Sequence, residues 1–338
     1  MSNYVFGPVP SRRLGRSLGV DLVPFKTCSF DCIYCQLGRT TCKTMERKPY
    51  VPVNEVIEEL AGTLRAGVPH PSPRVSHGGA RAPGVKGGAP ALDYVTLSGS
   101  GEPTLHSEMG EVVQAAKGLT EAPVAVLTNG SLLWDDEVRR ACAEADIVIP
   151  TLAAHDESSF QRVHRPYPGL TLRQHVDGLV AFREEYTVPL WLELFVLEGI
   201  NTGDEGFEGM ASLISRIRPH RIQLNTAVRP TSESSAVAVS PETLRDWASR
   251  LGPKAEVIAD YSQRCRPESV PGQSDTVLAL CRRRPCTLDD IAATLGLHRN
   301  EATKYITELL AGGRLIAERR NGREYFMAKR CQDDFSRL

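Results

Sequence analysis

The chain has 338 residues, of which 41% are hydrophobic and 24% are charged, and its formal net charge is -1. This balance argues against a chain-wide surface for nucleic acid or membrane, although it leaves room for a local basic patch. No stretch approaches the roughly 18 apolar residues that cross a bilayer. The N-terminal residues include Pro and Arg where a secretory signal has an apolar core. We therefore expect a cytoplasmic protein with no membrane partner.

Short apolar runs alternate with helical patterns from about residue 18 to residue 260. Strands are predicted at 18–23, 94–97, 124–127, 146–149, 190–196 and 221–224. Helices are predicted at 53–65, 108–117, 135–144, 172–185, 207–217 and 241–250. Such alternation implies a parallel sheet with crossover helices. The predicted fold class is α/β: a partial (βα)6 barrel of the TIM type over residues 1–260, with the active site in loops at the carboxyl ends of the strands.

Two segments depart from this alternation. Residues 66–91 are rich in Gly and Pro and poor in large apolar groups, which predicts a flexible insertion after the first helix. A neutral surface insertion is favoured there over a substrate lid. Residues 261–273 carry two prolines and are interpreted as a linker.

The C-terminal part, residues 274–330, has a pattern of its own. Asn321-Gly322 separates two β-like runs and predicts a two-residue hairpin turn. Three helices followed by a hairpin predict a small winged helix-turn-helix domain, with a tail at 331–338. The helices are predicted at 276–284, from Thr287 to Gly296, and at 299–310.

Three of the nine cysteines, Cys28, Cys32 and Cys35, form a C-x3-C-x2-C loop after the first predicted strand. Reduced thiols are expected in the absence of an export signal, so a tight group of cysteines indicates a metal site or a catalytic site. Three thiolates hold a [4Fe–4S] cluster and leave one iron open to a ligand with an amine and a carboxylate. Zinc is the alternative, with Cys42 as fourth ligand, but zinc ligands usually come in two separated pairs and no second pair follows.

The loop resembles the signature of the radical S-adenosylmethionine superfamily, C-x3-C-x-aromatic-C, with Tyr34 at the aromatic position. The resemblance implies a [4Fe–4S] cluster that cleaves S-adenosylmethionine reductively. The product is a 5′-deoxyadenosyl radical, which abstracts hydrogen from a substrate. It also implies an external electron donor of the flavodoxin or ferredoxin type. Tyr34 is then expected to contact the adenine of the cofactor.

Further loops resemble other cofactor-binding elements of that superfamily. Gly99, Ser100, Gly101 and Glu102 follow the second strand and resemble its Gly-Gly-Glu element, so the resemblance implies that they hold the cofactor's ammonium group. The resemblance also implies contacts with the ribose, carboxylate or adenine at the ends of three later strands. These weaker candidates are Asn129, for which helix capping is equally favoured, Thr151 and Asn225.

Several charged residues are open to two interpretations. Glu193 lies on an apolar strand, so it either pairs with a base or serves the site. Lys26 and Arg165 are candidate partners for anionic substrate groups, although a solvated surface charge is favoured for both. The remaining candidates for phosphate contacts are Arg12, Arg13 and Arg16, for which plain surface positions are equally favoured.

Residues 5–260 resemble a subgroup of the superfamily related to the wyosine-base tRNA synthases, which implies RNA or tRNA modification. The likeness rests on residues 7–20, the cysteine loop, 98–104, 127–131 and 223–225. The true wyosine synthases carry a second cluster on three upstream cysteines, and no cysteine precedes Cys28. The likeness therefore supports reductive cleavage of S-adenosylmethionine by a radical mechanism. It does not support the particular reaction of the wyosine synthases.

A winged helix offers a surface for RNA, formed by its third helix and its wing. The basic residues expected there are Arg299, Lys304, Arg319, Arg320 and Arg323. Glutamates are interspersed among them, so protein docking or dimerisation is equally favoured, and the same chemistry on a small molecule, peptide or cofactor precursor is the first alternative. A zinc-binding transcription factor is the second alternative. The sequence fixes neither the substrate nor the oligomeric state.

Overall fold

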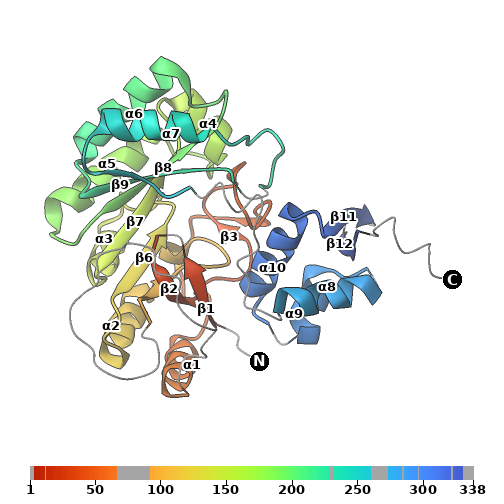
Figure 1. The fold of residues 1–338 in the computed structure, drawn as a ribbon. Helices are drawn as coiled ribbons and strands as arrows, with labels where there is room; N and C mark the ends of the chain where they lie inside the picture. Colours follow the sequence, from red (N-terminus) through yellow and green to blue (C-terminus); the bar gives the residue numbers. More distant parts are fainter. Residues whose placement is uncertain are drawn as a thin grey trace.

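A computed structural model describes residues 4–11, 13–66, 92–228, 231–259, 273–283, 285–295, 297–320 and 323–329. Its main sheet has eight strands in the order β1-β2-β5-β6-β7-β8-β9-β10 (Figure 1). β1 (Val5–Ser11) runs antiparallel to β2 (Gly15–Val20), and each later neighbour is parallel. These later strands are β5 (Tyr94–Leu97), β6 (Val124–Thr128), β7 (Ile147–Leu152), β8 (Trp191–Val196), β9 (Arg221–Thr226) and β10 (Ala255–Val257).

The helices of this part cover one face of the sheet. They are α1 (Val53–Arg65), α2 (Met109–Leu119), α3 (Asp136–Ala143), α4 (Glu157–His164), α5 (Leu172–Glu185), α6 (Gly203–Ile217) and α7 (Pro241–Leu251). On β8, Leu192 and Leu194 belong to the large core beneath the helices, whereas Glu193 and Phe195 lie on the opposite face, here called the inner face. Strands in sequential order with helices on one face follow the winding of a βα barrel. The predicted α/β fold with a parallel sheet is therefore confirmed.

All six predicted parallel strands are present, one with the predicted ends (Tyr94–Leu97) and five with shifted ends. The first was predicted at 18–23 but spans Gly15–Val20, because the chain leaves the sheet at Asp21. Sequence analysis did not predict β1, β10 or α4. The predicted insertion, apart from Ala66, and the linker, apart from Gln273, lie outside the described residues.

The turn between β1 and β2 closes one end of the inner face. Leu14 is only 2% exposed and packs with Ala125, Ile147 and Ile149 of β6 and β7. The neighbouring Arg13 reaches Glu193, so this arginine, predicted as a phosphate contact, forms an internal ion pair instead. Arg12 lies outside the described residues.

The C-terminal part contains the predicted order of elements, three helices and an antiparallel hairpin. They are α8 (Gln273–Arg283), α9 (Leu288–Leu295), α10 (Arg299–Ala311), β11 (Leu315–Arg320) and β12 (Arg323–Ala328). This part has its own apolar core, which includes Ile291, Ile306 and Phe326. The predicted turn at Asn321 and Gly322 lies outside the described residues. The winged-helix assignment and the domain boundaries stay predictions.

The N-terminal end of α10 packs against the sheet domain (Figure 1). The ring of His298, which caps the helix, stacks on Phe6 with centroids 4.9 Å apart. Arg299 places its guanidinium 4.2 Å from the ring centre of Phe25. The Lys304 ammonium lies 5.7 Å from the ring centre of Phe6. Two of the five basic residues predicted to face RNA therefore lie against the sheet domain.

None of the helices in the described part of the chain is both long enough and apolar enough to cross a membrane.

We predict that Leu14→Ala destabilises the protein by about 2–5 kcal/mol, because it empties a buried position against β6 and β7. Urea unfolding followed by circular dichroism measures this loss. Leu119→Ala is the matched control, since Leu119 is 38% exposed at the end of α2, and it is expected to stay within about 0.5 kcal/mol of the wild type. Equal losses for both variants would contradict the burial of the turn.

Candidate functional site

The cysteine loop begins after β2 and is tied to the carboxyl end of α4. The N–H groups of Asp31 and Ile33 donate to the carbonyls of His164 (2.9 Å) and Val163 (3.0 Å). Carbonyls in the last turn of a helix lack partners within the helix, so the loop supplies them. Next to them, Arg165 adopts a left-handed conformation at the helix end.

Arg165 was a candidate partner for an anionic substrate group, although a solvated surface charge was favoured. Its guanidinium donates instead to Glu233, with an Nη1–Oε1 distance of 2.8 Å. Lys26 also has a left-handed backbone, and its positive charge opposes the rise that burial causes in the pKa of Cys35. Lys26 therefore lies close enough to the cysteine loop to act on it electrostatically.

Each of the three cysteine sulfurs has its own hydrogen-bond partners. The Cys28 sulfur accepts from the Phe30 N–H and from the Asn129 amide at 3.4 Å. The Cys35 sulfur accepts from two backbone N–H groups, those of Leu37 and Gly38.

The Cys32 sulfur has side-chain partners, the Tyr34 hydroxyl and Nδ1 of His164 at 3.3 Å. Burial raises the pKa of the Cys28 thiol to about 12 and raises the pKa values of Cys32 and Cys35 as well. The thiols are therefore protonated at neutral pH, and binding of a metal releases protons.

These residues fit a cluster better than a single ion. In the described part of the chain, no group of three or more His, Cys, Asp or Glu side chains is arranged to hold one metal ion. A four-iron cluster presents separate corners, so its ligands surround a common space instead of converging on a point. Charge on Cys28 and Cys35 raises the pKa of Cys32, which places the three sulfurs within electrostatic reach of one another. Three thiols with N–H donors around them have the chemistry that a [4Fe–4S] cluster with one open iron requires of its ligands.

The loop after β5 lies directly against the cysteine loop. The Lys26 N–H donates to the Ser100 carbonyl at 2.6 Å, and the Glu102 N–H donates to the Thr27 carbonyl at 3.1 Å. A β-carbon on Gly101 would overlap the carbonyl oxygen of Thr27. Glycine is therefore required by the close approach of two backbones.

Glu102 is buried and joins the loops after β5 and β6. Its Oε1 accepts from Thr104 and from the Thr128 hydroxyl at 2.6 Å, while Oε2 accepts from the Asn129 N–H at 2.7 Å. Burial raises the pKa of Glu102, and these hydrogen bonds oppose that rise. Oε2 keeps a lone pair for a further donor. The predicted ammonium acceptor is thus also a structural connector.

Asn129 makes one contact within its own turn and others with the cysteine loop. Its Oδ1 accepts from the Ser131 N–H at 2.8 Å, but this segment is a turn and the next helix, α3, is capped by Asp135, so Asn129 does not cap a helix. Its Nδ2 donates to Ser29 at 2.9 Å and to the Cys28 sulfur. The structure therefore brings Asn129, Glu102 and the cysteine loop together, and the cofactor contact of Asn129 stays a prediction.

The other two weaker candidates, Thr151 and Asn225, both form hydrogen bonds with the Glu193 carboxylate at the inner face. Thr151 donates to Oε2 of Glu193 at 2.7 Å, and Asn225 donates to Oε1 at 2.8 Å. The Arg13 guanidinium lies 2.7 Å from Oε1. Burial raises the pKa of Glu193, but Arg13 and these hydrogen bonds outweigh that effect and hold the pKa below 4.5. Of the two interpretations of Glu193, pairing with a base or service in the site, the structure shows the first.

Tyr34 lies in an apolar cluster near the same face. Its ring stacks on Phe195, with centroids 4.1 Å apart and planes inclined by 18°. Ile33, Val163 and Leu197 belong to this cluster. Phe195 therefore covers one face of the ring that was expected beside adenine.

Sequence analysis did not identify Asp21, which links the loop after β5 to α10. Asp21 is 5% exposed and accepts from the Ser100 N–H (3.1 Å), the Ser100 hydroxyl and the Asn300 amide (3.3 Å). His298 Nε2 lies 3.7 Å from the same carboxylate. An acidic residue at a strand end was the only local indication, since one partner lies 279 positions away.

We predict that Asp21→Asn removes a pH dependence of stability. Burial raises the folded-state pKa of Asp21 from 3.8 to about 6, so the folded state holds this proton more tightly. The protonated carboxyl contributes stability that is fully present below the unfolded pKa and is lost as the pH rises through the folded pKa. The loss is about 3 kcal/mol. The variant should therefore gain stability relative to the wild type between pH 4 and pH 7.

Urea unfolding at these two pH values measures the gain. Asp136→Asn on α3 is the control, because that carboxylate is exposed (68%) and should show a much smaller change. A constant difference between wild type and Asp21→Asn would contradict the raised pKa.

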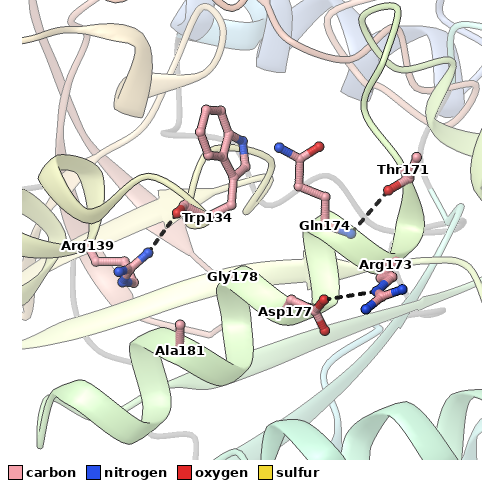
Figure 2. Close-up of a pocket in the computed structure, with 8 residues that line it drawn as sticks. All are labelled: Trp134, Arg139, Thr171, Arg173, Gln174, Asp177, Gly178 and Ala181. Carbon is pink, nitrogen blue, oxygen red and sulfur yellow. Dashed lines mark hydrogen bonds and ion pairs between the residues drawn. The ribbon is translucent and has the colours of Figure 1, made fainter.

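A surface pocket of about 460 Å³ lies elsewhere, between α5 and the segment before α3 (Figure 2). Its charged groups are already paired: Arg173 with Asp177, and Arg139 with Glu185 and two backbone carbonyls. No predicted site residue lines it. The lining residues are Trp134, Arg139, Thr171, Arg173, Gln174, Asp177, Gly178 and Ala181. This pocket is therefore separate from the candidate site.

We predict that Gly101→Ala destabilises the protein by about 3 kcal/mol or more, because the methyl group would separate the two loops. Thermal unfolding of the apoprotein measures this effect. Gly62→Ala in α1 is the control, since nothing lies within 4 Å of the added carbon, and it should gain about 0.5–1 kcal/mol. Similar unfolding temperatures for both variants would contradict the close approach.

No protein-family model matches the chain. The chain is 30% identical to a UPF0026 protein of Helicobacter pylori strain J99 over 328 residues, which are 96% of this chain and 97% of that protein. The chain belongs to the UPF0026 family. It is also 32% identical over 321 residues to the GTPase Obg of Brachyspira hyodysenteriae, covering 94% of this chain but 44% of that protein. The chain contains no Gly-Lys-Ser or Gly-Lys-Thr sequence, which the phosphate loop of a P-loop GTPase requires.

Among solved structures, a radical SAM methyltransferase from Sphaerobacter thermophilus is similar with a TM-score of 0.50 and 17% sequence identity. The match covers 72% of this chain and 66% of that one. At this identity the likeness concerns the fold. This chain therefore shares the fold of a radical SAM enzyme over most of its own length.

Proposed function

We propose that this UPF0026 protein is a radical S-adenosylmethionine enzyme whose cluster is held by Cys28, Cys32 and Cys35. When bound there, a [4Fe–4S] cluster with one open iron would bind S-adenosylmethionine and pass it the electron that releases a 5′-deoxyadenosyl radical. An external donor of the flavodoxin or ferredoxin type would supply that electron. The observation that carries the proposal is the contact of the cysteine loop with the loop that follows β5.

The chain's own residues have distinct parts in the proposal. The free lone pair on Oε2 of Glu102 would accept from an ammonium group beside the cysteine loop. Thr151 and Asn225 already contact Glu193, so this carboxylate would orient them toward a polar ligand on the inner face. Lys26 would supply positive charge near an anionic group. These contacts bind and orient; none of them moves a proton.

We predict that alanine variants of Cys28, Cys32 and Cys35 each lose the [4Fe–4S] absorption and the reductive formation of 5′-deoxyadenosine. Removal of one thiolate leaves too few ligands for a cluster with a single open iron. Anaerobic reconstitution, iron and sulfide analysis and product chromatography measure these losses. Cys42→Ala is the control, because Cys42 is exposed on β4 (Cys42–Lys43), which pairs with β3 (Thr27–Cys28). It should keep both properties.

Two results would contradict the proposal that this protein is a radical S-adenosylmethionine enzyme with these three ligands. One is stoichiometric zinc in the wild-type protein with no cleavage of S-adenosylmethionine, which would favour the zinc-binding alternative. The other is an intact cluster in all three cysteine variants, which would place the ligands elsewhere.

For the substrate, we propose RNA held partly by the C-terminal part acting as a winged helix. Arg299 and Lys304 pack on aromatic rings of the sheet domain, whereas Arg319 and Arg323 on the hairpin are exposed. This arrangement favours contact through the hairpin over contact through the start of α10. The Arg320 side chain lies outside the described residues.

We predict that the double variant Arg319→Ala/Arg323→Ala weakens tRNA binding. It should also reduce the slope of log affinity against log salt by about one per arginine. Fluorescence anisotropy at several salt concentrations measures both effects. The double variant Arg140→Ala/Arg245→Ala removes the same charge from exposed positions on α3 and α7 and should change little. Equal effects of the two double variants, or no binding by the wild type, would favour a small molecule or peptide substrate.

A further inference from the structure

The side chain of His164 is buried at the last position of α4, in contact with the cysteine loop. Its Nδ1 lies 3.3 Å from the Cys32 sulfur. Aromatic rings surround it: the ring centres of Phe30 and Phe160 lie 4.7 Å and 5.2 Å from its own. A polar ring in such surroundings is costly unless it forms a hydrogen bond, and the sulfur provides one.

The position of the ring hydrogen follows from the two nitrogens. Nε2 of His164 is buried and has no hydrogen-bond partner among the described residues. A hydrogen on Nε2 would therefore be a buried donor without an acceptor, whereas a hydrogen on Nδ1 points at sulfur. A thiolate bound to iron has no hydrogen to give. In that state the contact forms only with His164 as the donor.

We propose that His164 is a positioning residue for Cys32, whose Nδ1–H donates to the iron-bound sulfur and raises the reduction potential of the cluster. This inference rests on the proposed function, because it requires a cluster on Cys32. The reduced cluster carries one more negative charge than the oxidised cluster. A hydrogen bond to a ligand sulfur stabilises that charge, and hydrogen bonds to sulfur are among the determinants of cluster potentials.

His175 on α5 offers a matched control. It is as buried as His164, and its ring lies 6.1 Å from His164 and 6.0 Å from Phe30 between ring centres. Among the contacts of the described residues, none joins His175 to a cysteine of the loop. A variant at this position therefore alters the same packing without removing a donor to sulfur.

The test compares reconstituted wild type, His164→Leu, His164→Asn and His175→Leu. Redox titration without S-adenosylmethionine, followed by electron paramagnetic resonance, gives each midpoint potential. His164→Leu should have a more negative midpoint. His164→Asn keeps an N–H at the place of Nδ1, so its midpoint potential should lie closer to that of the wild type. The midpoint potential of His175→Leu should equal that of the wild type. An unchanged midpoint in His164→Leu, or equal shifts in both leucine variants, overturns the proposal.

A second measurement needs no variant to fold. Wild type labelled with 15N-histidine should show a 15N coupling to the reduced cluster in pulsed electron paramagnetic resonance. Absence of this coupling overturns the role of His164 without contradicting the proposed enzymatic function. If the wild type assembles no [4Fe–4S] cluster at all, the proposed function itself fails, so the two failures are distinct.

Discussion

The close approach of Gly101 to the Thr27 carbonyl is the constraint on which the site depends. Two backbone hydrogen bonds, through Lys26 and Glu102, hold the loops after β2 and β5 together on either side of it. The Glu102 carboxylate then extends this connection to the loop after β6. The height of the cysteine loop above the strand ends is thus set by backbone contacts, which a change of side chain elsewhere does not alter.

The inner face shows how a buried charge is stabilised before any ligand arrives. Glu193 takes hydrogen bonds from β7 and β9 and an ion pair from the turn before β2. A buried carboxylate without these partners would be protonated or would destabilise the fold. Leu14 fills the space next to Arg13, so apolar and ionic contacts of a single turn close this end of the sheet.

Local sequence patterns predicted the elements well and the long-range contacts poorly. The helices at 53–65 and 172–185 and the strand at 94–97 were predicted to the residue, because each is a periodic or buried run between clear breakers. β1 was missed since its Gly and Pro residues are typical of loops, and α4 is only 8 residues long. The spacing of Cys28, Cys32 and Cys35 made them the candidate ligands, and the structure places other candidate residues beside their loop.

The partners of the candidate residues could not be predicted in this way. Periodicity shows which face a residue occupies and not which residue it meets. The contacts of Glu193 with Arg13 and of Cys32 with His164 join positions 180 and 132 residues apart. No motif of the sequence relates them.

The hydrogen bond from Asn300 to Asp21 has a consequence for the order in which the protein is assembled. A ribosome makes Asp21 and the loop around Ser100 long before it makes α10, which lies 279 positions after Asp21. Contacts between such distant residues form late, because the whole intervening chain must be in place. The loop beside the cysteines therefore reaches its final set of hydrogen bonds only when α10 has been synthesised and has folded back onto the first strands.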